Sequence, residues 1–238
     1  MKNINNVLKT PKLNLAASSL QAPQLLITGG RAPKADWLNQ LCDMNNFVKI
    51  IAADHGIDSC QNANLTPDLL IGDGDSASAS AWQWAAEQHV PTQKYPRAKD
   101  YTDTQLALEL MQQANAKSII ITGGFGGRFD HSYSTIFSCA NFKTPCAIID
   151  ETEAIFFIKA TEIFTFSCPQ AVIPKAISLI PVTSQCTDVT STNLRWSLVH
   201  ATLTQKFPNA ISNEALASDF SVSIAQGILG VYFYWGTK

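Results

Sequence analysis

The sequence predicts an N-terminal α/β domain with a mostly parallel, Rossmann-like sheet, followed by an all-β domain that forms a small sandwich or barrel. Short apolar runs alternate with helical patterns from Leu25 to about residue 150, an order typical of a parallel sheet. Several of these runs end in glycines or carboxylates. After about Ile149 the runs are β-rich with almost no helical periodicity. We therefore expect a flexible tail at 1–24, the α/β domain at 25–150 and the β domain at 151–238.

The α/β part opens with a strand, a glycine turn and a helix. Leu25-Leu26-Ile27 leads into Thr28-Gly29-Gly30, and the later strands end at Asp54-His55-Gly56 and at Gly72-Asp73-Gly74-Asp75. Parallel sheets place their ligands at the carboxyl ends of the strands. In chain order we expect a strand at 25–27, a helix at 36–43, strands at 48–53 and 69–71, a helix at 80–88, a strand at 92–95, a helix from 103, a strand at 118–122 and a helix at 130–140.

A capping box marks one helix start. Thr102 and Gln105 have the spacing at which a hydroxyl and a side-chain amide satisfy each other's free N–H groups. Asp103 then occupies the first helical position, in the favourable field of the helix dipole. We expect one buried face on this helix, formed by Leu106, Leu110 and Ala114 with Ala107 and Met111 beside them.

The second part contains apolar and β-branched runs in place of helices. The last two runs flank Gln226-Gly227, which we interpret as a two-residue hairpin turn. The β-rich runs lie at 154–166, 176–183, 221–225 and 228–235.

Composition limits the function classes. The 238 residues are 46% hydrophobic, carry a net charge of -2 and contain no Lys/Arg-rich run, so no basic field for nucleic acid is present. The six cysteines are scattered singly, as reduced core thiols are. We find no leader-like apolar segment and no membrane span in the sequence. We expect a cytoplasmic protein that binds neither nucleic acid nor membrane.

The segment Ile71 to Ser76 is the first candidate site. Carboxylates two residues apart in an extended segment point to one side, so Asp73 and Asp75 can share an ion, and hard oxygen ligands suit Mg²⁺. The glycines at 72 and 74 allow a phosphate to approach the backbone. The alternative is a polar turn rich in turn-forming residues.

Three other clusters favour a polyphosphate site. Lys99-Asp100-Tyr101-Thr102-Asp103 supplies a cation and two carboxylates, of which helix capping explains Thr102 and most of Asp103. The run from Gly123 to His131 offers glycine N–H groups and Arg128, which can clamp phosphate oxygens. The third cluster is Asp54-His55-Gly56, in which a histidine by itself is more often structural.

Common alternatives lack their motifs. No G-x-x-x-x-G-K-[ST] loop occurs, and no G-x-G-x-x-G is followed by an acidic residue at the required distance. A G-x-S-x-G elbow is also missing. The site is therefore neither that of a Walker-type NTPase, nor a usual dinucleotide site, nor that of a serine hydrolase.

The ordered set of motifs resembles the thiamin pyrophosphokinase family. The likeness extends into the β part, where Thr192-Asn193-Leu194-Arg195-Trp196-Ser197-Leu198 is similar to the family's Thr-Gly-Leu-Lys-Trp-x-Leu and Ile211-Ser212-Asn213-Glu214 to its Ser-Asn motif. It spans Leu25 to Tyr234. The resemblance implies transfer of the pyrophosphoryl group of ATP to the thiamin hydroxyl, giving thiamin diphosphate and AMP, in a homodimer whose active site lies at the subunit interface.

The resemblance also implies site residues. Asp73, Asp75 and Asp103 would hold Mg²⁺ and, with Asp100, form the catalytic carboxylates. Asp75 or Asp100 would orient or deprotonate the alcohol. For Trp196, Ser212 and Asn213 the resemblance implies thiamin binding, although taken alone Trp196 is a core aromatic and Ser212-Asn213 a turn. The residues implied in binding ATP are Asp54, Gly56, Lys99, Thr102, Gly124, Arg128, Asp130 and His131.

Four positions depart from the family pattern. His55 and Asp58 replace a glycine and an amide near the nucleotide, so His55 either narrows the pocket or bonds a phosphate. Gly74 replaces an aromatic, which predicts a more mobile loop. Asn193 replaces a glycine, and Asn tolerates a left-handed conformation. Two other functions stay open: a related magnesium-dependent pyrophosphokinase acting on another heteroaromatic alcohol, and a non-catalytic thiamin or nucleotide sensor.

Overall fold

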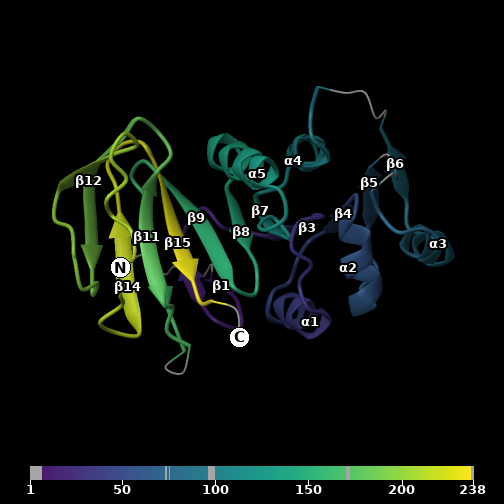
Figure 1. Cartoon of the computed structure of the whole chain (residues 1–238), viewed down its shortest axis with the longest axis horizontal. Coiled ribbons are helices and arrows are strands. Elements are labelled where there is room, and N and C mark those ends of the chain that lie inside the picture. Colours follow the sequence, from purple (N-terminus) through teal and green to yellow (C-terminus); the bar gives the residue numbers. More distant parts are fainter. Residues whose placement is uncertain (1–6, 73, 75, 96–99, 170–171, 237–238) are drawn as a thin grey trace. The chain divides into compact units, whose positions relative to one another are not determined.

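The structure is a computed structural model of the chain and describes residues 7–72, 74, 76–95, 100–169 and 172–236. The chain folds into two compact units, drawn in Figure 1. One unit is continuous, from Ala22 to Glu151. The other joins Thr152–Lys238 to the N-terminal segment Met1–Gln21.

The continuous unit is built on a parallel sheet with the strand order β8-β7-β3-β4-β5-β6. Helices follow most of its strands, so the carboxyl ends of the strands share one edge of the sheet. Every residue of β7 is buried, as expected for a strand covered on both faces. The strands are β3 (Pro23–Ile27), β4 (Ile50–Ala53), β5 (Leu69–Gly72), β6 (Thr92–Lys94), β7 (Ser118–Thr122) and β8 (Cys146–Ile149).

Five helices cover this sheet in two groups. Figure 1 shows α4 and α5 on one face and α1, α2 and α3 on the other, and helices within each group contact one another. Within the described residues, none of these helices has the length and apolarity to cross a bilayer. The helices are α1 (Ala35–Met44), α2 (Gly56–Ala63), α3 (Ala79–Glu87), α4 (Asp103–Gln113) and α5 (Phe129–Asn141). The predicted α/β fold is confirmed, although α2 was not predicted from the sequence.

The second unit is a β-sandwich. Its two sheets have the orders β1-β2-β10-β14-β12-β13 and β11-β15-β9. Four phenylalanines from both sheets meet in its core, with ring centroids 5.0–5.8 Å apart: Phe156, Phe166, Phe220 and Phe233. The strands are β1 (Val7–Lys9), β2 (Asn14–Ala16), β9 (Glu153–Lys159), β10 (Ile163–Ser167), β11 (Ala176–Pro181), β12 (Gln185–Thr192), β13 (Ala201–Thr204), β14 (Asp219–Ser223) and β15 (Ile228–Tyr234).

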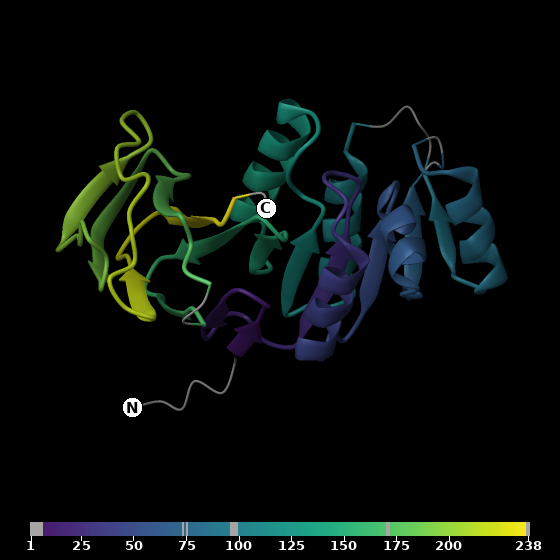
Figure 2. The same cartoon turned by 60° about the horizontal axis from the view of Figure 1, so that its bottom comes forward.

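The N-terminal segment corrects the expectation of a flexible tail at 1–24. Residues 7–9 and 14–16 are strands, and β2 pairs with β10, so Leu8, Leu13 and Leu15 are buried in the sandwich. Figure 2 shows this segment in purple, before the chain enters β3. Three-residue strands are too short to produce a recognisable alternation, and their pairing partner lies about 150 residues away in sequence.

The predicted hairpin at Gln226-Gly227 is wrong. β14 pairs with β10 and β12, whereas β15 pairs with β9 and β11, so the chain changes sheets between them. Gln226 accepts a backbone hydrogen bond from Thr187, and a side chain at Gly227 would meet the Gln185 carbonyl at 2.6 Å. Two adjacent β runs with a turn dipeptide fit a sheet-to-sheet crossing as well as a hairpin.

The capping box of α4 is confirmed, but its buried face is rotated from the predicted one. Gln105 N–H donates to Thr102 Oγ1 at 3.2 Å, and Thr102 N–H donates to Gln105 Oε1 at 3.0 Å. The buried residues are Ala107, Leu108 and Met111, while Leu106 and Leu110 are half-buried and Ala114 is exposed. The apolar residues of this helix spread over a broad arc, so its periodicity fits two overlapping faces and packing decides between them.

Candidate functional site

A cavity of about 510 Å³ lies at the carboxyl ends of β3, β4 and β7. Its lining comes from the loop from Thr28 to Gly30, the end of β4 at 53–55, Ser76, the start of α4 at 101–104, and the stretch from Gly123 to Thr135 in α5. This is the edge of the sheet at which the sequence placed the candidate motifs. Six predicted site residues line the cavity: Asp54, Thr102, Asp103, Gly124, Arg128 and His131.

The start of α5 forms one wall of the cavity. The Gly123–Gly127 loop leads into this 13-residue helix, and Arg128 at its N-cap makes no side-chain capping bond. The N-terminus of a helix carries partial positive charge and free N–H groups, which favour an anion. With glycines before it and a guanidinium beside it, this wall has the chemistry of a phosphate site.

Arg128 is held by Asp130. The Arg128 Nη2 and Nε atoms donate to the two carboxylate oxygens of Asp130 at 2.6 and 3.1 Å. This hydrogen bonding raises the pKa of Arg128 and lowers the pKa of Asp130. Both side chains are exposed, so the pair adds little to stability. Asp130 therefore orients Arg128 at the edge of the cavity. Asp130 itself, which was predicted to bind ATP, is not among the residues that line the cavity.

The start of α4 forms a wall of opposite character. The capping box satisfies two of its backbone N–H groups, those of Thr102 and Gln105, and Asp103 brings a carboxylate into the cavity lining. Asp54 brings a second one, and its Oδ1 occupies the space where a side chain at Gly72 would lie. Hard oxygen donors of this kind suit Mg²⁺, and Gly72 directly precedes Asp73. The described residues contain no cluster of three metal-binding side chains, and Asp73 and Asp75 lie outside them.

The two glycine loops of the cavity are joined by hydrogen bonds. Thr28 Oγ1 donates to the Gly123 carbonyl at 2.7 Å, and Gly30 N–H donates to the same oxygen at 2.8 Å. Arg31 N–H donates to the Phe125 carbonyl at 2.6 Å. The loop after β7 is therefore an ordered turn, although a sequence so rich in glycine does not by itself require one.

A buried carboxylate supports this turn from below. Asp150, directly after β8, is 4% exposed and accepts hydrogen bonds from Gly123 N–H at 2.7 Å, Thr122 Oγ1 at 3.1 Å and Phe125 N–H at 3.3 Å. Burial raises the pKa of Asp150 to about 6, against the opposing effect of these bonds and of Arg31. Asp150 was not among the predicted site residues. Its position directly after a buried strand was the available signal.

The residues that depart from the family pattern make specific contacts. His55 lines the cavity, and its Nδ1 lies 3.2 Å from the Ser76 carbonyl and 3.3 Å from Asp58 Oδ2. Asp58 also accepts from Ser78 N–H at 3.3 Å. Together they attach the segment after Asp75 to α2. A Cβ at Gly74 would lie 3.1 Å from the Trp82 indole, so an aromatic ring occupies the space beside this glycine.

Other predicted residues lie elsewhere. Gly56 begins α2, where any side chain would collide with the Ile27 carbonyl, so its role is close packing of helix against strand. Asp100 is exposed and outside the cavity lining. Lys99, like Asp73 and Asp75, falls outside the described residues. Cavity residues that the sequence reasoning missed include Thr28 to Gly30, Tyr101, Ser132 and Thr135.

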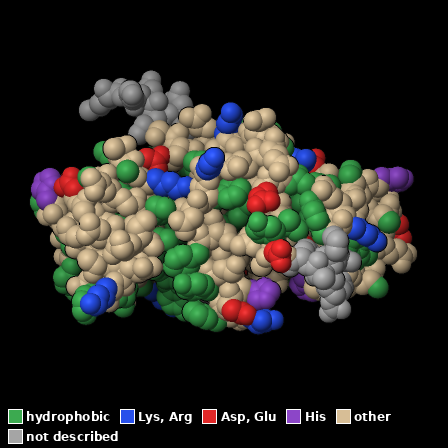
Figure 3. All heavy atoms as spheres, turned by 90° about the horizontal axis from the view of Figure 1, so that it is seen from above, with side chains coloured by type: hydrophobic (Ala, Val, Ile, Leu, Met, Phe, Trp, Pro, Cys, Tyr) green, Lys and Arg blue, Asp and Glu red, His purple; other side chains and the backbone are tan. Residues whose placement is uncertain are grey.

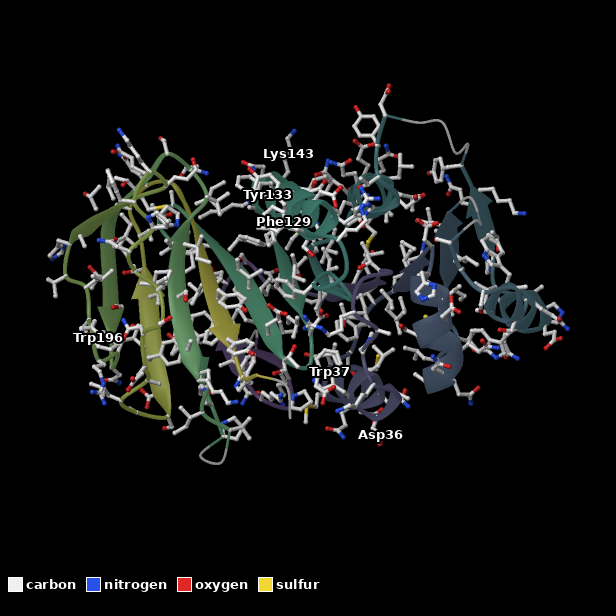
Figure 4. The ribbon with its side chains drawn as sticks, viewed as in Figure 1. Asp36, Trp37, Phe129, Tyr133, Lys143 and Trp196 are labelled. Carbon is white, nitrogen blue, oxygen red and sulfur yellow. The ribbon has the colours of Figure 1, made fainter. Side chains whose placement is uncertain are left out.

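The predicted thiamin-binding residues form a cluster of their own in the β-sandwich. Trp196 is 57% exposed (Figure 4). Asn213 holds the backbone of Trp196 by accepting from Trp196 N–H at 3.1 Å and donating to the Trp196 carbonyl at 2.9 Å. One N–H of the Asn213 amide remains for another partner. Ser212 is exposed beside it at φ +60°, and Asn193 adopts the left-handed conformation expected for it, at φ +55°.

The described surface shown in Figure 3 has no broad field of one charge that could attract an anion from a distance. Figure 3 views the molecule from the side of α4 and α5, where side chains of both charges are scattered among polar and hydrophobic ones. Two aromatic side chains of α5, Phe129 and Tyr133, are exposed on this helix with ring centroids 6.0 Å apart (Figure 4). Attraction of an anion therefore depends on the α5 wall itself.

Sequence comparison finds one family in both units. The family model described as thiamin pyrophosphokinase, catalytic domain, matches residues 41–149, and the vitamin B1 binding domain of the same family matches 164–229. A thiamine pyrophosphokinase of Bacillus subtilis is 26% identical over 182 residues, covering 75% of this chain and 84% of that protein. A thiamin pyrophosphokinase of Caenorhabditis elegans is 23% identical and covers 68% of each chain.

Solved structures show the same fold. The crystal structure of the Bacillus subtilis enzyme superposes with a TM-score of 0.77 at 23% identity, covering 90% of this chain and all of that one. Yeast thiamin pyrophosphokinase gives a TM-score of 0.68 at 15% identity, over 89% and 86% of the two chains.

Proposed function

Because the chain belongs to the thiamin pyrophosphokinase family, we propose that it transfers the pyrophosphoryl group of ATP to the hydroxyl of thiamin, giving thiamin diphosphate and AMP. The observation that carries the proposal is the cavity at the carboxyl ends of the parallel strands, with the positive start of α5 on one wall and Asp103 on the other. A polyphosphate with a bound cation needs both kinds of wall. We further propose that the protein is a cytoplasmic homodimer.

The carboxylates of the cavity fit Mg²⁺. Asp103 and Asp54 line it, and we assign Asp73 and Asp75 to the same ion because they come one and three residues after Gly72, against which Asp54 lies. When bound, Mg²⁺ neutralises phosphate charge and helps align the reacting groups. In this proposal Thr102 caps α4, and Asp103, the first residue of that helix, is the ligand of the ion.

Arg128, Gly124 and the start of α5 bind the polyphosphate in this proposal. The guanidinium that now meets the two oxygens of Asp130 has the fork geometry that fits two phosphate oxygens equally well. His131, three residues after Arg128, also lines the cavity, and Lys99 precedes α4, so both add donors. Phosphoryl transfer depends on such positioning and charge neutralisation more than on covalent catalysis.

The thiamin hydroxyl oxygen attacks the β-phosphorus as the bond to the α-phosphate oxygen breaks, and AMP leaves. A carboxylate, Asp75 or Asp100, takes the hydroxyl proton. We assign thiamin to Trp196, whose exposed ring suits stacking on a heteroaromatic cation, with Ser212 and the remaining N–H of Asn213 bonding its polar edge. In the proposed homodimer this cluster faces the cavity of the partner subunit.

The test is product identification. Purified protein with ATP, thiamin and Mg²⁺ should form AMP and thiamin diphosphate in equal amounts, as measured by chromatography with mass detection. Asp73→Asn should abolish turnover and leave thiamin binding nearly unchanged. Formation of neither product under varied metal ions would remove the proposal.

Two alternatives have their own outcomes. A pyrophosphokinase acting on another heteroaromatic alcohol would form AMP faster with a different member of a panel of alcohols. A non-catalytic sensor would bind thiamin or nucleotide without turnover. The carboxylates Asp54 and Asp103 in the cavity favour catalysis, because a sensor needs no metal-ligating pair.

A further inference from the structure

Asp150 is a buried carboxylate that none of the predicted roles includes. It lies directly after β8 and is 4% exposed. Burying a carboxylate is costly unless its oxygens are hydrogen-bonded. Its three donors, Gly123 N–H, Thr122 Oγ1 and Phe125 N–H, all belong to the end of β7 and the glycine loop that follows.

These bonds complete a frame around Gly124. Asp150 holds the N–H groups of Gly123 and Phe125, and the 28–31 loop holds their two carbonyl oxygens through Thr28, Gly30 and Arg31. Gly123 and Phe125, the residues on either side of Gly124, are therefore each held at both the N–H and the C=O group. Gly124 lines the cavity, so the frame determines how the loop faces a ligand there.

We propose that Asp150 is a positioning residue for the polyphosphate site: it holds the Gly123–Phe125 turn in the geometry in which the loop and the start of α5 bind phosphate oxygens. This inference rests on the proposed function for the identity of the ligand. Asp150 does not line the cavity, so it acts through the loop. Among the residues that the structure describes, the charged group that acts on Asp150 is Arg31, from the loop after β3.

The test compares Asp150→Asn with a matched control. An amide keeps one acceptor oxygen but places an NH₂ group against one of the two backbone N–H donors. The control is Asp68→Asn, because Asp68 Oδ2 also accepts a backbone hydrogen bond, from Ile50 N–H at 2.7 Å, at the amino ends of β4 and β5 and away from the cavity. Amide exchange of Gly123 and Phe125 is followed by NMR, and binding of Mg²⁺-ATP by calorimetry.

In Asp150→Asn we expect faster exchange at Gly123 and Phe125, a Kd and KM for ATP raised about tenfold, and an unchanged KM for thiamin. Asp68→Asn should leave all of these values at the wild-type level. A folded Asp150→Asn protein with wild-type ATP affinity would overturn the proposal, as would unchanged exchange at both amides.

A second variant covers the case in which Asp150→Asn does not fold. Thr122→Val keeps the carboxylate and removes the O–H that holds its Oδ1, so we expect faster exchange at Gly123 and an ATP Kd raised about threefold. Unchanged values in this variant would equally overturn the proposal. Failure of the wild-type protein to bind Mg²⁺-ATP would instead refute the proposed function, while the exchange data would still report on the turn.

Discussion

The two helices that begin at the cavity start in opposite ways. α4 begins with a capping box that satisfies the N–H groups of Thr102 and Gln105, and it presents the carboxylate of Asp103. α5 follows a glycine loop, has no side-chain cap at Arg128, and presents a guanidinium. Both helices direct the positive end of the dipole toward the site. The difference shows how the residues at two helix starts give opposite charge to two walls of one cavity.

Removing the charge from the α4 wall should have the largest effect. Asp103→Asn should lower kcat by about 10³-fold, because the phosphate charge that develops during transfer loses a metal-binding carboxylate. Steady-state kinetics at saturating ATP and Mg²⁺ measure this kcat. The matched control is Glu109→Gln, an exposed carboxylate on the same helix, which should change kcat less than twofold. A mild effect of Asp103→Asn would mean that the two walls do not differ as described.

Support of the α5 wall by Asp150 should appear in the pH dependence of stability. The folded pKa of about 6 exceeds the ordinary value of 3.8, so the folded protein binds more protons between these values. Asp150 therefore favours folding below about pH 3.8, and this contribution is lost as the pH rises through 6.

The wild-type free energy of unfolding should thus fall by up to about 3 kcal/mol relative to that of Asp150→Asn between pH 4 and pH 7. Urea denaturation of both proteins at several pH values in this range gives the slope of the free energy of unfolding against pH for each. Parallel curves would show that Asp150 titrates as an ordinary exposed carboxyl does.

Removing the cation from the α5 wall should weaken nucleotide binding. Arg128→Ala should raise the KM for ATP about 30-fold and leave the KM for thiamin unchanged, because a bidentate contact to phosphate is lost. Lys143→Ala removes an exposed positive charge beyond the other end of α5 and serves as the control. Equal effects of the two variants would indicate a general charge effect and would argue against a local anion site.

Loss of the α4 cap should have the smallest effect. Thr102→Ala removes the hydroxyl that accepts from Gln105 N–H, at a cost of about 1 kcal/mol, or roughly 2–4 °C in Tm. Ser78→Ala, which removes the corresponding cap of α3, should lower Tm by a similar amount. We expect Thr102→Ala to reduce activity in addition, since it loosens Asp103, and Ser78→Ala to leave activity unchanged. Equal activity in both variants would contradict this expectation, because it would show that the cap at Thr102 does not affect metal binding by Asp103.

Local features of the sequence predicted local features of the structure well. The capping box at Thr102 was predictable because both partners lie three residues apart and need no other part of the chain. The strand ending before Gly123 was predictable because five buried positions in a row fit a central parallel strand. Both features place cavity residues correctly without knowledge of the rest of the fold.

Features that depend on distant pairing were not predictable. Asp150 meets Gly123 across 27 residues, through the pairing of β7 with β8, and its position after a strand does not show that it lies against the Gly123 loop. Leu15 is buried because β2 pairs with β10, far along the chain. The hairpin prediction at Gly227 is wrong for the same reason, since the local sequence is compatible with a hairpin and the change of sheets depends on distant strands.

The most direct test of the two-wall site is a crystal structure with Mg²⁺ and an ATP analogue that cannot transfer its pyrophosphoryl group. We expect the polyphosphate against the Gly124 loop and the first turn of α5, with Arg128 moved from Asp130 to phosphate oxygens and Mg²⁺ between the phosphates and Asp103. Phosphates bound away from α5, or a metal ion without Asp103 among its ligands, would contradict the account.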